Sequence, residues 1–375
     1  MKFKRIIAVS LISALSLGIL VAVASGKQQP TNRTFHIKTV SGNPDQLSDA
    51  KLTTIMKTDS NQFEKVTISH GKTMFSKIEF DEKYRVGPDV LNHKALYRKN
   101  AHANSFESEK EWITAYFDPL FSYRSQDPIL YLAREDKKTG KVTKNEMTLP
   151  DIASNDQIMN EALQELNGQL YYIVTSTINE KSFVKLYSID AHSLALKHVM
   201  SEEAALSEGT YVNLSNIVHD QNAFYMTASN DKEATLALLD PAKKTLAYKP
   251  LPKNIEAGQL QNSIFLKDGR LYLQSEDGKL HVADLAATQK DAQELKVALP
   301  SEVTYFYAID LFTKNNQLFV LYSASGDNPT AESSAYIAVY DQVNGKNLFT
   351  GKMPGIKDHG LQVGYSFVQS YRQKL

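Results

Sequence analysis

The chain contains nine histidines, and histidine is the side chain best suited to hold a metal ion or to transfer a proton near neutral pH. No two of them have the His-Glu-x-x-His spacing of a helical zinc site. His192 and His198 flank a predicted turn and are interpreted as surface residues. His281 lies in an apolar run that is typical of a strand, where a satisfied core or edge histidine is the usual role. The sequence therefore predicts no metal site.

Other sequence patterns that could carry out chemistry are absent as well. The segments 229–233 and 327–332 hold oxygen ligands in loops, but neither has the spacing of a calcium-binding EF-hand loop. No nucleophile-elbow, Walker or dinucleotide-binding motif occurs. The chain has no cysteine, which excludes disulfides, cysteine-ligated zinc, iron–sulfur clusters and thiol nucleophiles. We expect no catalytic residue and no cofactor.

An aromatic triplet gives the clearest signal for ligand binding. Tyr305, Phe306 and Tyr307 follow shortly after Pro300, and tyrosine rings can stack on a sugar or another flat ring. His359 precedes the last apolar run of the chain. The alternative interpretation is that alternating aromatic residues pack in a core. Tyr305, Tyr307 and His359 are the candidate ligand-binding residues.

The elements that would position these residues are short apolar runs broken by turns every ~8–12 residues, which predicts an all-β fold. A polar turn followed by an apolar strand recurs at 167–172, 220–226, 267–273 and 314–320. The equivalent residues Leu170, Phe224, Leu271 and Leu318 are separated by 54, 47 and 47 positions. Helical periodicity is scarce, and the best helix candidate is the short segment 156–166.

A second repeated element is an apolar strand that ends in aspartate and runs into a polar turn. The aspartates of this element are Asp136, Asp190, Asp240, Asp284 and Asp341. Such a carboxylate can accept hydrogen bonds from the backbone N–H groups of the turn. Gly140 and Gly345 stand where these turns need a left-handed residue.

A third element is an apolar residue followed by proline, which marks the end of an outer strand. The pairs are Leu149-Pro150, Leu251-Pro252, Leu299-Pro300 and Met353-Pro354. Together the three elements define five units, at about 101–150, 151–203, 204–252, 253–300 and 301–354. Each unit holds four short strands in roughly 50 residues, which is the size of a β-propeller blade.

Strand-like runs also lie outside these units, at 34–40, 51–57, 64–69 and 73–80 before them and at 361–371 after them. Pairing of the last run with the N-terminal strands would leave no sheet edge open and would close the ring. The sequence thus predicts an all-β propeller over residues 34–375. It favours seven blades, with six as the alternative.

The strand–Asp–turn–Gly-Lys–strand unit resembles the repeats of the PQQ-like and YVTN-like β-propeller superfamily of bacterial envelope proteins. The resemblance covers roughly residues 120–354. It implies a propeller fold and a place in the bacterial envelope. Repeats of this superfamily that bind a quinone cofactor carry a recurrent tryptophan, and this chain has only Trp112. The resemblance therefore implies no quinone cofactor.

The N-terminus has the pattern of an export signal. Lys2, Lys4 and Arg5 precede the uncharged run 6–23, and 22–24 has small residues at the two positions that signal peptidase reads. The run is long enough to be either a cleaved signal peptide or a retained membrane anchor. We expect residues 1–24 to serve as one of these, and 25–33 to form a linker. In both cases the body of the protein is extracytoplasmic, secreted or anchored by its N-terminus.

These features favour a non-catalytic binding or interaction module at the bacterial cell envelope, with an unknown protein or glycan as ligand. The 42 basic and 42 acidic residues balance, which argues against a nucleic-acid partner. One alternative is an enzyme that acts on carbohydrate or peptidoglycan-related substrates at the propeller channel mouth. A second alternative is a membrane-anchored accessory or sensor subunit. The fold does not choose among these functions, because propellers host all of them.

Overall fold

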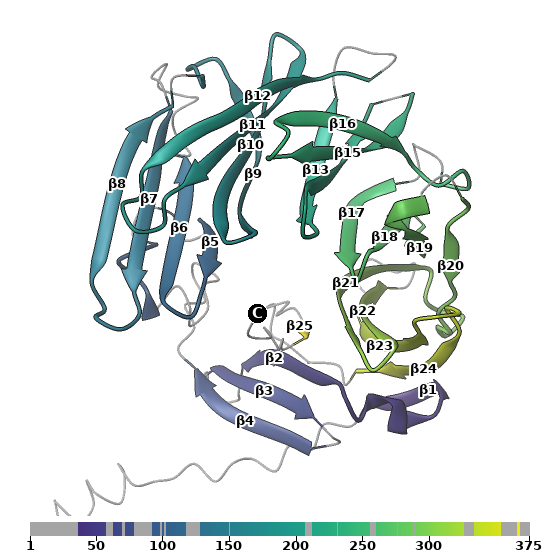
Figure 1. The fold of residues 1–375 in the computed structure, drawn as a ribbon. Coiled ribbons are helices and arrows are strands. Elements are labelled where there is room, and N and C mark those ends of the chain that lie inside the picture. Colours follow the sequence, from purple (N-terminus) through teal and green to yellow (C-terminus); the bar gives the residue numbers. More distant parts are fainter. Residues whose placement is uncertain are drawn as a thin grey trace, which may run out of the picture.

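The computed structural model describes residues 37–57, 63–69, 72–78, 92–97, 100, 103–117, 128–149, 151–206, 212–230, 232–255, 260–275, 277–287, 290–325, 334–353 and 366–367. In this part of the chain six antiparallel sheets stand around a common axis as the blades of a β-propeller (Figure 1). Two short 3-10 helices, Pro44–Leu47 and Leu285–Ala287, lie in connections.

The strands of a blade follow one another in chain order from the axis outwards, except that blades 1 and 6 each include a strand from the far end of the chain. Blade 1 contains β25 (Ser366–Phe367), β2 (Lys51–Lys57), β3 (Phe63–Ser69) and β4 (Lys72–Ile78). Blade 2 contains β5 (Asn104–Glu107), β6 (Glu111–Phe117), β7 (Ile129–Asp136) and β8 (Val142–Thr148). Blade 3 contains β9 (Gln157–Leu166), β10 (Gln169–Ile178), β11 (Lys181–Ile189) and β12 (Leu196–Ala204).

Blade 4 contains β13 (Asn213–His219), β14 (Phe224–Ser229), β15 (Ala234–Asp240) and β16 (Thr245–Pro250). Blade 5 contains β17 (Leu260–Lys267), β18 (Arg270–Ser275), β19 (Leu280–Asp284) and β20 (Gln293–Leu295). Blade 6 has five strands: β21 (Tyr305–Lys314), β22 (Gln317–Ser325), β23 (Ser334–Asp341), β24 (Asn347–Lys352) and β1 (Lys38–Gly42). The five repeat units found in the sequence are blades 2 to 6.

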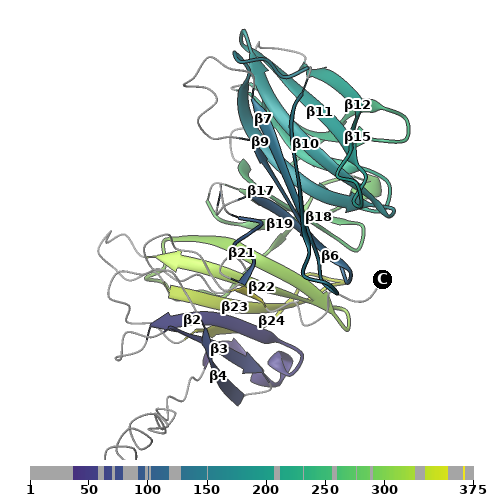
Figure 2. The ribbon, with the colours of Figure 1, turned by 90° about the vertical axis from the view of Figure 1, so that its left-hand side faces the viewer.

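The innermost strands contact one another around the axis, from β5 through β9, β13, β17 and β21 to β25. Neighbouring innermost strands run in the same direction. The side-chain amides of Asn160 and Gln164 on β9 bond the carbonyls of Leu214 and Ile217, which follow in the same order on β13. We call the end at which the innermost strands begin the start face. The opposite end carries the turns after the repeated aspartates and is the Asp-turn face. Figure 2 shows the ring from the side.

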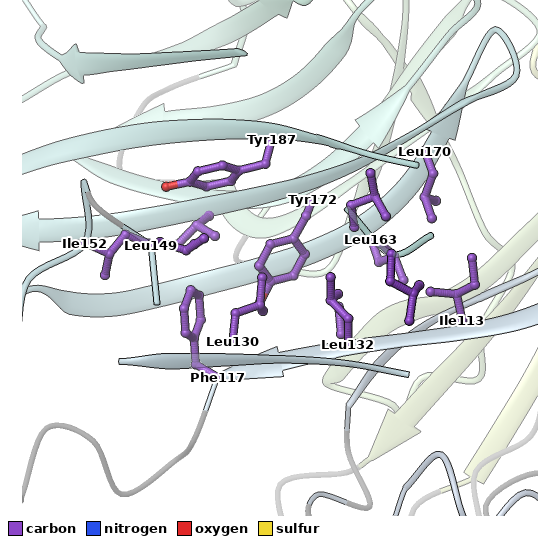
Figure 3. Packing of buried hydrophobic residues seen from close by; sticks show 14 residues of the cluster. Ile113, Phe117, Leu130, Leu132, Leu149, Ile152, Leu163, Leu170, Tyr172 and Tyr187 are labelled. Carbon is purple, nitrogen blue, oxygen red and sulfur yellow. The ribbon is translucent and has the colours of Figure 1, made fainter. Parts of the chain in front are cut away.

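The core lies between blades, because alternate residues of each strand point to opposite faces of its sheet. Blades 2 and 3 share a cluster that includes Leu132, Tyr172 and Tyr187 (Figure 3). Similar buried clusters join blade 3 to 4, 4 to 5, 5 to 6 and 6 to 1. The equivalent residues Leu170, Phe224, Leu271 and Leu318 all lie in these clusters, with at most 4% of their surface exposed.

The aspartate-capped turns predicted from the sequence are present in all five units. Asp136 Oδ1 accepts bonds from the backbone N–H groups of Lys138 and Thr139, at 3.1 and 2.8 Å. Asp190 Oδ1 accepts one from Ser193 at 2.7 Å. Equivalent bonds are made by Asp240, Asp284 and Asp341. Gly140 and Gly345 have positive φ angles of 67° and 70°, as these turns require.

The connections after the predicted Leu-Pro pairs run from an outer strand inwards to the next blade. Leu149 and Leu251 are buried, and each is part of a cluster between two blades. At three of the pairs a backbone bond closes a short turn: Ile152 N–H bonds the carbonyl of Leu149, Ile255 N–H that of Pro252 and Val303 N–H that of Pro300. Pro354 lies outside the described residues. The connection thus contributes buried residues to the core between two blades and then leads into the next innermost strand.

The ring is closed by both ends of the chain. β25 is the inner strand of blade 1, with Ser366 opposite Thr53 and Phe367 opposite Leu52. β1 lies along the outer edge of blade 6, where Lys38 is opposite Lys352. The predicted closure by the last strand is confirmed. The preferred count of seven blades is wrong: the described chain forms six. The early strand near 34–40 extends blade 6, so the N-terminal strands supply only one further blade.

The helix candidate 156–166 is also wrong, because Gln157–Leu166 is β9. Its apolar residues are spaced in a way that fits a helix as well as a strand with a bulge. The bulge lies opposite Thr175 and Ser176 of β10 and shifts the register by one residue. Pairing along the whole of β10 therefore decides the conformation of this segment.

Removal of residues 360–375 should lower the melting temperature by more than ~5 °C, because it deletes the inner strand of blade 1. Removal of residues 1–42 should have a smaller effect, since the residues of β1 are largely exposed on an outer edge. Calorimetry of both truncated chains checks this order. Equal melting of the 360–375 deletion and the full chain would contradict closure by β25.

Replacement of Asp190 by Ala should lower the melting temperature at neutral pH and have less effect in acid. Hydrogen bonds from the Ser193 backbone and then from its side chain lower the pKa of Asp190 below its ordinary value of 3.8. The stability that this carboxylate contributes is therefore present above the ordinary pKa and is lost as the pH falls through the lowered pKa. Thermal melts between about pH 7 and pH 3 measure the difference. A difference that stays constant with pH would contradict the cap.

Candidate functional site

The aromatic triplet begins β21, the innermost strand of blade 6, at the start face. Phe306 packs on the cluster between blades 5 and 6, with its ring 5.8 Å from that of Tyr322. Tyr305 and Tyr307 point to the other side of the strand, where 43% and 39% of their surfaces are exposed. Phe306 is therefore the residue of the triplet that packs between blades, while Tyr305 and Tyr307 each keep more than a third of their surface exposed.

The two tyrosines form an open pair. Their ring centroids are 6.0 Å apart and the ring planes are inclined by 52°. The residues opposite them on β22 are Ser325 and Ser323, so two half-buried serines share their face of the sheet. Two phenol rings with hydroxyl groups beside them can pack on the C–H face of a sugar and bond its hydroxyls.

A close backbone contact fixes the start of β21 against blade 5. Gly278 lies in the turn between β18 and β19 and has a φ of 82°. A Cβ atom at this position would lie 1.7 Å from the carbonyl oxygen of Phe306. Only glycine allows both this conformation and this approach. The position of Phe306, and with it that of Tyr305 and Tyr307, depends on this contact.

Met159 is a third exposed apolar residue on an innermost strand at the start face. It is 44% exposed and stands at the bulge of β9, between Ile158 and Asn160. Thr175 on β10 and Ser323 on β22 each lie five residues after the equivalent residues Leu170 and Leu318. Asn160 is opposite Thr175, and Tyr307 is opposite Ser323. Met159 and the tyrosines therefore lie at the same level of their blades. Sequence reasoning missed Met159 because it interpreted this segment as a helix.

His359, the third candidate ligand-binding residue, lies outside the described residues, as does the loop 327–332. Within segment 229–233, Asn230 Oδ1 accepts bonds from the backbone N–H groups of Lys232 and Glu233, and Asp231 lies outside the described residues. His281 is half-buried on the side of β19 that faces blade 4, and burial lowers its pKa. Among the described residues no group of three or more acidic or histidine side chains is arranged to hold a metal ion.

A buried charged cluster anchors the connection between blades 2 and 3. The ammonium of Lys185 on β11 donates to Asp156 Oδ2 at 2.6 Å and to the carbonyl of Asp151, and both charged side chains are almost fully buried. Tyr187 donates to Asp151 Oδ1 at 2.6 Å, and His198 Nε2 lies 3.4 Å from Asp151 Oδ2. These residues are far apart in sequence, so no local pattern indicated the cluster. Its position between two sheets assigns it to holding the connection in place.

Glu161 on β9 joins the same two blades. Its carboxylate accepts a bond from the buried hydroxyl of Tyr172 and is bonded by the backbone of Phe117 on blade 2. Burial raises the pKa of Glu161 against the opposing effect of these bonds. The side chain faces the cluster between blades 2 and 3 and not the axis of the ring.

No protein-family model matches the chain, and no curated protein matches it in sequence. Solved structures of other propellers are similar to it in fold. TolB from Acinetobacter baumannii is 12% identical with a TM-score of 0.39, and the match covers 82% of this chain and 64% of TolB. BamB from Moraxella catarrhalis is 11% identical with a TM-score of 0.35, covering 84% and 78%. The Synechocystis apocarotenoid oxygenase is 9% identical with a TM-score of 0.46, covering 84% and 74%.

The chain thus spans less than two thirds of the length of TolB. At these identities the likeness extends to the β-propeller fold and assigns no activity or ligand. The described residues contain no helix that is long and apolar enough to cross a membrane. The expected export segment 6–23 lies outside the described residues.

Replacement of Gly278 by Ala should destabilise the protein by ~2 kcal/mol or more beyond the same change at Gly140. Both glycines have a positive φ, which costs an alanine ~1–2 kcal/mol, but a Cβ at Gly140 meets nothing within 4 Å. The difference between the two variants in chemical denaturation isolates the clash with Phe306. Equal destabilisation would show that β21 does not depend on this contact.

Proposed function

We propose that the chain is a non-catalytic binding module that acts outside the cytoplasm at the bacterial cell envelope. Its ligand is a glycan, held at the start face by Tyr305 and Tyr307. The observation that carries the proposal is the exposure of these two rings on an innermost strand, the place where all blades of the ring converge. Phe306, between them, is the residue that packs in the core.

The chemistry of the pair supports a glycan. Each tyrosine that packs on a sugar contributes ~1 kcal/mol beyond the area it buries, and its hydroxyl group can bond the sugar. Ser323 and Ser325 lie opposite the two tyrosines and add hydroxyl groups on the same face of the sheet. The rings are attached to a ten-residue strand that pairs with β22, so little conformational freedom is lost on binding.

The proposed location is supported by the basic residues Lys2, Lys4 and Arg5 before the apolar run 6–23. Fractionation of cells and sequencing of the N-terminus of the mature protein test it. A new N-terminus near Ser25 indicates cleavage, and intact Met1 in the membrane fraction indicates an anchor. A soluble cytoplasmic pool with intact Met1 would contradict the location.

Tyr305→Ala and Tyr307→Ala should each weaken glycan binding about fivefold, which corresponds to ~1 kcal/mol per ring. A glycan array that includes peptidoglycan fragments identifies the ligand, and calorimetry measures the affinities. Met74→Ala is the matched control, because Met74 is 54% exposed but lies on β4, the outermost strand of blade 1.

The control should leave both affinity and stability unchanged. Folded tyrosine variants that bind with full affinity would place the ligand elsewhere. Loss of fold in both variants would show that the tyrosines are structural.

A further inference from the structure

The first strand of the described chain joins the ring at the start face. β1 runs antiparallel to β24, with Lys38 opposite Lys352. The same row of paired residues continues across β23 and β22 to Ala308 on β21. Tyr305 and Tyr307 lie just beyond Ala308, towards the start of the strand. The chain that precedes Lys38 therefore leaves blade 6 on the face that carries the two tyrosines.

The length of this preceding chain limits where the ring can lie. Residues 24–37 separate the apolar run 6–23 from β1. A random-coil chain of fourteen residues has a root-mean-square span of about 20 Å. A ten-residue strand such as β21 rises by roughly 33 Å. If the Asp-turn face looked towards the apolar run 6–23, residues 24–37 would have to run back along the side of the ring. They would then span well more than the random-coil length.

We propose that the start face looks towards the membrane, and that the glycan bound by Tyr305 and Tyr307 is one presented from the membrane surface. This inference rests on the proposed function in the form in which residues 6–23 are kept as an anchor. The formal charge of the chain is zero, so the chain as a whole has no net attraction to anionic lipids. The orientation is set by the tether, the segment 24–37, because this segment joins blade 6 at the start face.

Fluorescence energy transfer to labelled lipid tests the orientation, and the absence of cysteine allows single sites to be labelled. Ser301→Cys places a dye on the exposed connection before β21, at the start face. Val343→Cys places it in the turn between β23 and β24, at the Asp-turn face, where Val343 is 71% exposed. Ser301 precedes the innermost strand of blade 6 and Val343 lies in a turn of the same blade, so the two dyes report on the two ends of one blade.

The full chain is reconstituted in phosphatidylethanolamine–phosphatidylglycerol vesicles that contain a small fraction of rhodamine-labelled lipid. Transfer from position 301 should clearly exceed transfer from position 343. A chain without residues 1–24 is the control and should show no transfer from either position, because it has no tether.

Equal transfer, or stronger transfer from position 343, would overturn the inferred orientation while leaving the binding function intact. A mature chain that lacks Met1 and does not associate with the vesicles would overturn the anchored form of the proposed function, and this inference with it. Loss of glycan binding on replacement of the tyrosines bears only on the site, so the two failures can be told apart.

Discussion

Each blade of this protein can bury its apolar faces only against the blades beside it. A four-stranded sheet with apolar residues on both faces is not stable by itself in water, because both faces would be exposed. A row of such sheets would still expose two apolar faces, one at each end. Closing the row into a ring removes those ends. The pairing of β25 with β2 and the packing of blade 6 on blade 1 complete that ring. The clusters between the other blades depend on the same closure.

Closure also places the candidate site. Because the innermost strands all begin at one face, their first residues gather around a single axis. Some of these residues pack or bond between strands, as Phe306 and Asn160 do. Tyr305, Tyr307 and Met159 remain exposed at the same level. The candidate site is therefore a consequence of ring geometry combined with Tyr305 and Tyr307, two rings that each keep more than a third of their surface exposed.

The sequence predicted those parts of the structure that local chemistry decides. The caps made by Asp136, Asp190 and their equivalents are local, because each carboxylate accepts hydrogen bonds from backbone N–H groups two or three residues later in the chain. The blade count depends on pairing with a distant strand, and the conformation of 157–166 depends on its pairing with β10 and on a bulge, so local pattern misjudged both. The Lys185–Asp156 pair and the contact of Gly278 with Phe306 join residues about 30 positions apart and left no signal in the sequence.

The most direct measurement of the central claim, that the C-terminal strand closes a six-bladed ring, is a disulfide cross-link between β2 and β25. In this cysteine-free chain, Thr53→Cys combined with Ser366→Cys places two thiols on directly opposite residues. The structure predicts that mild oxidation forms the bond within one molecule and raises the melting temperature. Thr53→Cys with Phe367→Cys is the mismatched control, because consecutive residues of a strand point to opposite faces. Failure of the matched pair to cross-link, or equal cross-linking of both pairs, would contradict the closure.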